Sequence, residues 1–155
     1  MSARKGKKSG PLARTGAKRA GRPKQKPAAV SVKRGFAGLG LFAEEPITRG
    51  QFVIEYKGRV LSDARAQELN SKYLFAINRN WTIDGGSRAN TARYLNHSCR
   101  PNCEPGGWGK RVKIYALRNI KPNEELTYDY GAEYWEDRIK PHGCWCAKCS
   151  AAAPR

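Results

Sequence analysis

The chain has 155 residues and a formal net charge of +17, from 30 Lys and Arg against 13 Asp and Glu. This length fits one folded domain with a modest core. No apolar run approaches the roughly eighteen residues of a membrane span, and the N-terminus lacks the apolar core of a signal peptide. We therefore expect an intracellular protein, whose five cysteines favour metal binding or burial over disulfides.

The positive charge is concentrated at the N-terminus. Residues 1–34 contain twelve Lys or Arg and no carboxylate, and the rest of this segment is mostly Ala, Gly, Pro and Ser. Such a composition buries little apolar surface, so we expect residues 1–29 to be a disordered basic arm. The arm predicts salt-sensitive nucleic-acid binding through residues 1–34, or it serves only as a solubilising tail. Residues 20–24 (AGRPK) faintly resemble a minor-groove hook, and they could also be a localisation signal.

Short β-like segments separated by Gly follow the arm. They combine apolar and β-branched residues with turn signals at their ends, which is typical of strands. The expected strands lie at residues 32–43 (two strands around a Gly-rich turn), 51–56, 58–61, 73–77, 81–84 and 112–117. Many short strands with one clear helix indicate a β-rich α+β domain.

The one expected helix begins after Ser62 and continues to about Asn70. Ser62 is a suitable N-cap, because its hydroxyl can accept a hydrogen bond from a free backbone N–H of the first turn. Asp63 places a negative charge at the N-terminal end of the helix dipole.

Gly38, Leu39 and Gly40 form a Gly pair that could suggest a dinucleotide-binding turn. The third Gly and the following long helix of that motif are missing. The pair by itself indicates only that the backbone can approach another group closely.

Residues 93–103 (RYLNHSCRPNC) concentrate polar side chains in one short segment. Its amide, imidazole, hydroxyl, thiol and guanidinium groups need partners wherever they are buried. This segment therefore predicts a metal-linked turn or a ligand site.

Three further thiols lie close together near the C-terminus, at Cys144, Cys146 and Cys149. A structural zinc site is tetrahedral, so this group is one ligand short. From spacing alone, either Cys99 or Cys103 can supply the fourth sulfur.

The motifs, taken in order, resemble those of the SET-domain family of lysine methyltransferases. The resemblance covers roughly residues 30–149 and implies three regions: the basic arm at 1–29, a SET domain at 30–131 and a post-SET zinc-binding tail at 132–155. The segments that carry it are GLGLFA (38–43), NHSCRPN (96–102), ELTYDY (125–130) and the cysteine-rich tail, with weaker matches at 55–58 and 83–84.

The resemblance implies a SET fold of small curved β-sheets. In that fold residues 96–102 and the region of Tyr130 cross in a pseudoknot, a threaded arrangement that composition does not predict. A cofactor pocket on one face and a peptide groove on the other are joined by a narrow channel for the substrate lysine.

The implied cofactor is S-adenosylmethionine. Gly38 and Gly40 are expected to let the backbone close around its methionine part, and Trp145 to pack on its adenine, with Trp135 as the competing aromatic residue. The cofactor-binding residues implied by the resemblance are Gly38, Leu39, Gly40, Arg93, Asn96, His97, Tyr130 and Trp145.

Three tyrosines match catalytic positions of the family. Tyr130 matches the catalytic tyrosine, and Tyr73 resembles one that lines the lysine channel. Tyr128 matches a position that sets how many methyl groups fit, and a tyrosine there implies mono- or dimethylation. The alternative is that Tyr128 and Tyr130 are alternating strand residues that only pack.

In the family, one zinc ion joins the C-terminal cysteines to the cysteine of the NHSC motif. The resemblance therefore implies Zn²⁺ bound by Cys99, Cys144, Cys146 and Cys149, with Cys103 as a spare thiol or an alternative fourth ligand.

The expected substrate is a lysine of a histone, or of a histone-like nucleoid or other basic protein. The protein is then associated with chromatin in a eukaryotic nucleus or with the nucleoid in a bacterial cytoplasm. Two other classes remain open: a non-catalytic docking module for chromatin or nucleic acid, and a structural zinc protein with a nucleic-acid-binding tail.

Overall fold

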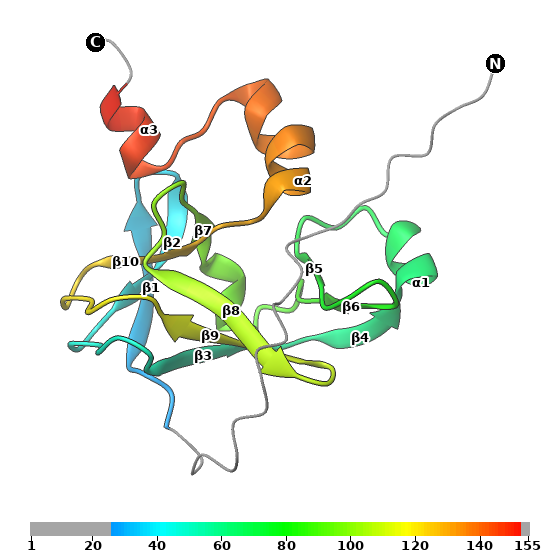
Figure 1. Cartoon of the computed structure of the whole chain (residues 1–155), viewed down its shortest axis with the longest axis horizontal. Helices are drawn as coiled ribbons and strands as arrows, with labels where there is room; N and C mark the ends of the chain where they lie inside the picture. Colours follow the sequence, from blue (N-terminus) through cyan, green and yellow to red (C-terminus); the bar gives the residue numbers. More distant parts are fainter. Residues whose placement is uncertain (1–25, 153–155) are drawn as a thin grey trace.

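The computed structural model describes residues 26–152, which form three small β-sheets with short helices around them (Figure 1). The expectations for the arm up to residue 25, including the hook-like stretch at 20–24, lie outside the described residues. Within 26–152 no helix has the length and apolar character of a membrane span.

The sheets have three or four strands each. All strand pairs are antiparallel except β7 with β10, which is parallel. The first sheet has the order β1 (Val30–Gly35), β2 (Gly38–Ala43), β10 (Glu125–Tyr128), β7 (Asn96–His97). The second has the order β3 (Phe52–Tyr56), β9 (Arg111–Ala116), β8 (Cys103–Trp108), and the third β4 (Arg59–Ser62), β6 (Trp81–Asp84), β5 (Leu74–Ala76).

Strands with a clear local pattern lie where the sequence predicts them. In β9, Val112, Ile114 and Ala116 are buried while the residues between them are exposed or half-buried. This alternation is the signature of a strand with one face on the core. The β1–β2 hairpin also forms as expected, and Gly38 at its turn has a φ of +105°, which favours glycine.

Helix α1 (Asp63–Gln67) has the predicted N-cap but is shorter than predicted. The Ser62 hydroxyl accepts from the N–H of Arg65. At the other end, the N–H groups of Glu68 and Leu69 donate to carbonyls three residues back. This tighter pattern closes the last turn, so the helix ends before Asn70.

Strand β8 was not predicted, because its sequence contains Pro105, Gly106 and Gly107. It is an edge strand, paired only with β9, where a proline that lacks an N–H is tolerated. Short C-terminal helices were also not predicted: α2 (Ala132–Tyr134), η2 (Trp135–Ile139), η3 (Lys140–His142) and α3 (Ala147–Ala152). A further helical turn, η1 (Thr91–Tyr94), precedes β7.

The core lies between the three sheets. Its largest fully buried side chains come from strands of the first two sheets and from β5 of the third, with Ile47, Asn90, Leu95 and Ile120 from the connections. Packing begins at Ala28, which is buried and whose N–H donates to the carbonyl of Val53 at 3.0 Å. Asn90 is also buried; its amide bridges the backbone of Lys57 and Gly85 and ties η1 to the third sheet.

Two segments far apart in the sequence lie side by side at the centre of the molecule. The N–H of Ser98 donates to Tyr128 O at 3.1 Å. Asn102 then donates to Glu125 O at 2.8 Å and accepts from the N–H of Thr127 at 2.9 Å. These bonds pair residues 96–102 with β10, and the three small sheets form the β-rich α+β domain that the sequence predicts.

Candidate functional site

A cavity of about 350 Å³ lies beside the point where residues 96–102 meet β10. Its wall combines the β2 hairpin, β5, η1, β10 and α2. Six of the residues predicted from the motifs line it together: Leu39, Tyr73, Arg93, Asn96, Tyr128 and Tyr130. The structure thus brings the three predicted catalytic tyrosines into one space with part of the predicted cofactor set.

Four predicted cofactor residues do not line this cavity. Gly38 and Gly40 flank Leu39 on β2 and lie immediately beside it. His97 lies behind the cavity wall, and Trp145 is on the surface with 66% of its area exposed.

Tyr128 and Tyr130 sit next to each other at the end of β10, with ring centroids 4.7 Å apart. The hydroxyl of Tyr130 donates to the carbonyl of Leu95 at 2.6 Å, which fixes the ring's direction. Burial raises the pKa of both tyrosines well above the ordinary value. Both therefore act as neutral hydroxyl groups at any physiological pH.

Three further tyrosines line the cavity and were not assigned a role from the sequence: Tyr56, Tyr94 and Tyr134. Tyr56, at the end of β3, is 6% exposed and donates to the carbonyl of Tyr73 at 2.9 Å. Burial raises its pKa as well. Tyr134 of α2 meets the Tyr130 ring edge-on at 4.9 Å between centroids. The only sequence signal for Tyr56 was its place in the weak match at 55–58.

Arg93 and Tyr73 form a stacked pair in the cavity wall. The guanidinium carbon of Arg93 lies 4.0 Å from the centroid of the Tyr73 ring, and this cation lowers the pKa of the Tyr73 hydroxyl. One Arg93 nitrogen donates to Gly86 O, while its Nε is buried without a partner among the described residues. Arg93 thus offers unused donors next to the cavity.

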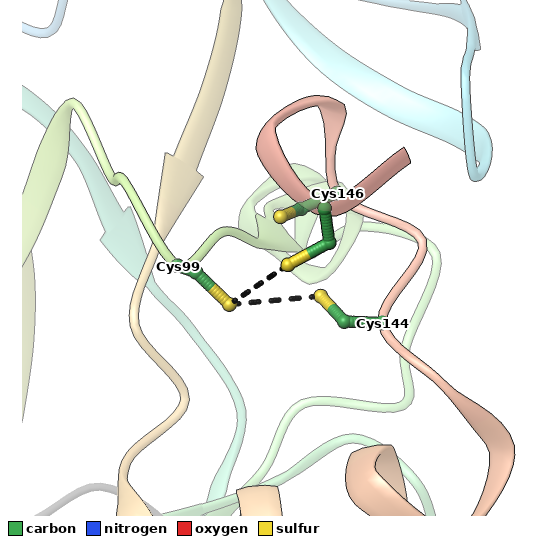
Figure 2. A group of neighbouring side chains, drawn as sticks. Cys99, Cys144 and Cys146 are labelled. Atoms are coloured by element: carbon green, nitrogen blue, oxygen red, sulfur yellow. Dashed lines mark hydrogen bonds between the residues drawn. The ribbon is translucent and has the colours of Figure 1, made fainter. Parts of the chain in front are cut away.

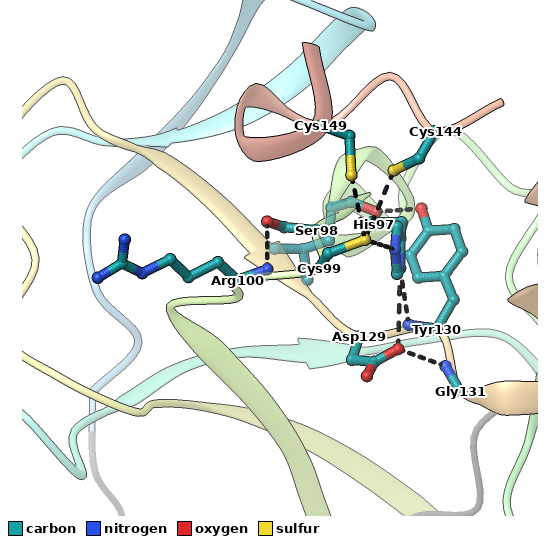
Figure 3. Close-up of polar contacts among 10 residues, drawn as sticks. His97, Ser98, Cys99, Arg100, Asp129, Tyr130, Gly131, Cys144 and Cys149 are labelled. Carbon is teal, nitrogen blue, oxygen red and sulfur yellow. Dashed lines mark hydrogen bonds and ion pairs between the residues drawn. The ribbon is translucent and has the colours of Figure 1, made fainter. Parts of the chain in front are cut away.

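His97 connects the cavity wall to the cysteines (Figure 3). Its ring packs between Tyr130 and Trp135, at centroid distances of 5.4 and 5.7 Å. The Nδ1 atom accepts from the N–H of Tyr130 at 3.2 Å, and Nε2 lies 3.5 Å from the sulfur of Cys99. Burial lowers the pKa of His97, more than Asp129 raises it, so the ring is neutral at pH 7.

Four cysteine sulfurs converge, one from just after β7 and three from the C-terminal segment; Figure 2 labels Cys99, Cys144 and Cys146. The sulfurs of Cys99, Cys144, Cys146 and Cys149 all lie within 4.8 Å of one another. Cys99 is 3.7 Å from Cys144 and 3.6 Å from Cys149. Sulfurs around a tetrahedral zinc, with Zn–S of about 2.3 Å, are about 3.8 Å apart, so this group fits one zinc ion.

The ionisation of these thiols differs within the group. Burial raises the pKa of Cys99 and Cys144. Burial also acts to raise the pKa of Cys146, but hydrogen bonds from neighbouring backbone and thiol groups outweigh it and lower that pKa to about 6. Cys103 lies outside the group, in the core, where burial raises its pKa to about 12. The structure thus brings Cys99, rather than Cys103, to the three C-terminal thiols.

The chain belongs to the SET domain family, because the family description "SET domain" matches residues 38–131, more than half of the chain. This match begins at the β1–β2 turn and ends just after Tyr130. It therefore contains every residue that lines the cavity except Ala37 and Tyr134.

Similar proteins include histone-lysine N-methyltransferases. ASHH1 of Arabidopsis thaliana is 36% identical over 126 residues, covering 73% of this chain and 26% of that protein. An H3 lysine-4 specific enzyme of Aspergillus oryzae is 42% identical over 123 residues, covering 69% of this chain and 10% of that protein. The chain therefore spans about a quarter or less of the length of these two relatives.

A solved structure is similar as well. A chain in the crystal structure of polycomb repressive complex 2 from Chaetomium thermophilum superposes with a TM-score of 0.62 at 31% identity, covering 69% of this chain and 16% of that chain. The three-dimensional arrangement of the sheets is therefore shared with a chain of that complex, and together with the family match this confirms the β-rich SET fold expected from the resemblance.

Proposed function

We propose that this chain transfers a methyl group from S-adenosylmethionine to a lysine side chain of a histone or another basic protein. The observation that carries the proposal is the mixed lining of the cavity. Arg93 and Asn96 give one part of the wall a polar character, and six tyrosines line the cavity as well.

The polar part suits a cofactor with charged and hydrogen-bonding groups. Arg93 has free donors, including a buried Nε, that fit a carboxylate or another acceptor of the cofactor. Leu39 and its flanking glycines offer backbone that can lie close to a ligand. When bound, S-adenosylmethionine supplies an electrophilic sulfonium methyl group.

The tyrosines suit a lysine amine that must be neutral and aligned. An environment of buried aromatic rings disfavours the ammonium form, so the amine loses its proton more readily there. Tyr130 is held by its bond to Leu95 O, and it can orient the amine lone pair without taking a proton itself. The hydroxyl of Tyr128 occupies space beside it, which supports mono- or dimethylation as the product.

Zinc, in this proposal, holds the C-terminal segment against the cavity. The four cysteines tie residues 144–149 to the end of β7, and His97, with Trp135 packed on its ring, lies between this cluster and Tyr130. Tyr134, on the same segment, lines the cavity directly. Metal binding and cavity shape are therefore expected to be coupled.

The substrate class follows from the relatives, which are named as histone-lysine N-methyltransferases. A histone substrate would locate this chain on chromatin. Nucleic-acid binding by the basic residues 1–34 is a further part of the proposal, supported by their charge alone.

The test is methyl transfer from radiolabelled S-adenosylmethionine to a panel of histones and other basic proteins, with Tyr130→Phe as the variant. The wild type should label lysine, and the variant should lose about 100-fold in rate, because the amine is no longer aligned. Circular dichroism should show that the variant stays folded. Cofactor binding without transfer would point to a substrate outside the panel, and absence of cofactor binding would overturn the proposal in favour of a docking module.

A further inference from the structure

Glu125, the first residue of β10, fills the space beside two glycines of the neighbouring hairpin. Its backbone pairs with Phe42 of β2. A Cβ atom at Gly35 would lie 2.9 Å from one carboxylate oxygen of Glu125, and a Cβ at Gly40 would lie closer still to the other. Neither glycine has a positive φ. A side chain at either position would therefore displace the Glu125 carboxylate, whereas the backbone conformation itself does not call for glycine.

The same carboxylate fixes the side chain of Asn96. The Nδ2 atom of Asn96 donates to Glu125 Oε1 at 2.8 Å and to Leu39 O at 3.0 Å. Both partners are acceptors, so only the NH₂ group can face them, which determines the orientation of the amide. Both amide hydrogens are then used, and no donor within residues 26–152 reaches Oδ1.

Asn96 lines the cavity, whereas Glu125 does not. We propose that Glu125 is a positioning residue: it holds Asn96 so that Oδ1 is presented as an acceptor to a donor group of the cofactor. The inference rests on the proposed function for the identity of the ligand. It also assigns Gly40 a role beyond close approach to the cofactor, since this glycine makes room for the carboxylate that orients Asn96.

The proposal can be tested by exchanging the amide of Asn96 and the carboxylate of Glu125 between the two positions. Asn96→Asp places a second carboxylate against Glu125 and should weaken S-adenosylmethionine binding by more than tenfold. Glu125→Gln keeps an acceptor oxygen and should weaken binding only a few-fold. In the double variant the amide introduced at position 125 can donate to the new carboxylate, which still leaves one acceptor oxygen for the ligand. About tenfold of the lost affinity should therefore return, a coupling of about 1.4 kcal/mol.

The experiment uses calorimetric titration of the full chain with S-adenosylmethionine, and thermal unfolding to confirm that each variant is folded. Glu124→Gln is the matched control, because Glu124 is the adjacent carboxylate and its partners are Arg118 and Asn102 rather than Asn96. It should bind within about twofold of wild type. Additive losses in the double variant, or equal losses from the control and from Glu125→Gln, would overturn the inference.

A second measurement separates this inference from the proposed function. In the cofactor-free protein, the side-chain NH₂ resonances of Asn96 should shift on Glu125→Gln and not on Glu124→Gln. If the wild type binds no cofactor, the proposed function fails, and these resonances then decide the orientation of Asn96 by themselves. Resonances that do not respond to Glu125→Gln would contradict the positioning role whatever the cofactor affinity.

Discussion

The three sheets and the C-terminal segment after Tyr130 are held in place by different interactions. The sheets share a continuous buried core, in which Leu41, Val53, Val112 and Ile114 are all fully buried. From residue 132 to 151 only the side chain of Cys146 is buried, and α2, η2 and η3 contain no buried residue. The segment instead contacts the sheets through its cysteines and a few aromatic rings.

This difference means that the cavity has two kinds of wall. Tyr128 and Tyr130 belong to β10 and the residues just after it, and are fixed by the core beneath them. Tyr134 belongs to the C-terminal segment, in which Cys146 of the cysteine cluster is the one buried residue from 132 to 151, so we expect its position to depend on that cluster. The hydrophobic effect therefore stabilises one wall, and sulfur ligation the other. Substitutions in the core should therefore lower the free energy of unfolding, whereas substitutions in the cysteine cluster should weaken metal and cofactor binding.

The largest expected effect is a loss of stability when a core side chain of the sheets is truncated. Ile114→Ala removes a fully buried side chain from β9 and should lower the free energy of unfolding by about 2–5 kcal/mol, through lost burial and the cavity left behind. Ile139→Ala is the control in the C-terminal segment, where the side chain is only half-buried, and should cost less than about 1 kcal/mol. Denaturant unfolding measures both. Equal costs would contradict the division between core and segment.

The next effect is on metal binding. Cys99→Ser should abolish stoichiometric zinc and weaken S-adenosylmethionine binding about tenfold, because Tyr134 is no longer held, while the far-UV spectrum of the sheets persists. Zinc is measured by atomic emission on the purified chain. Cys103→Ala is the control and should retain zinc, since Cys103 lies outside the group. If Cys99→Ser retained zinc and Cys103→Ala lost it, Cys103 rather than Cys99 would be the fourth zinc ligand.

Trp145→Ala should have a smaller effect than loss of the cysteine cluster. Because this side chain is exposed, the free energy of unfolding should change by less than about 0.5 kcal/mol. If Trp145 packs on the adenine, cofactor affinity falls by about 0.5–1.5 kcal/mol, an ordinary aromatic contact. Trp135→Ala distinguishes the two tryptophans: its ring packs on His97, so its loss should disturb the cysteine cluster too. Unchanged affinity in Trp145→Ala would remove that residue from the cofactor site.

The smallest effect concerns an ion pair on the second sheet. Arg111 donates two hydrogen bonds to Glu55, and this lowers the pKa of Glu55 below its ordinary 4.5. At a pH between the folded-state pKa and 4.5, the unfolded chain binds more protons at Glu55 than the folded chain does. The stability that the pair contributes is therefore present above pH 4.5 and is lost as the pH falls through the folded-state pKa. Glu55→Gln should cost less than about 1 kcal/mol at pH 7, because Arg111 is largely exposed.

The control for that titration is Glu104→Gln on β8, since Glu104 forms no ion pair among residues 26–152. The difference in unfolding free energy between wild type and Glu55→Gln should shrink toward zero below pH 4.5. A difference that grows on acidification would contradict the assigned direction of the pKa shift.

Local signals in the sequence were sufficient for part of the fold. The alternation in β9 and the Gly-rich turn of the β1–β2 hairpin are set by neighbouring residues, and both were predicted. Strand β8 was missed because Pro105 and its glycines argue against a strand, and only pairing with β9 overrides that preference. The helices of the C-terminal segment were missed because they have no buried face, and so no apolar periodicity.

The candidate site, like the fold, could be predicted only in part from the sequence. The ordered motifs named Tyr130, Asn96 and the C-terminal thiols, because residue type and spacing are properties of the sequence. Spacing alone left Cys99 and Cys103 as equal candidates, and the resemblance favoured Cys99. In the structure it is Cys99 that joins the cluster, because β7 ends beside the C-terminal segment while Cys103 begins β8 in the core.

The chemical groups of this protein and their order along the chain could be read from its sequence. That Tyr56 joins the other tyrosines and that Glu125 fills the space beside Gly40 followed from the folded arrangement alone. Glu125 lies far along the chain from Gly40, and their contact depends on the register of β10 against β2. Register follows from how the sheets bury their apolar faces together, which no local pattern encodes.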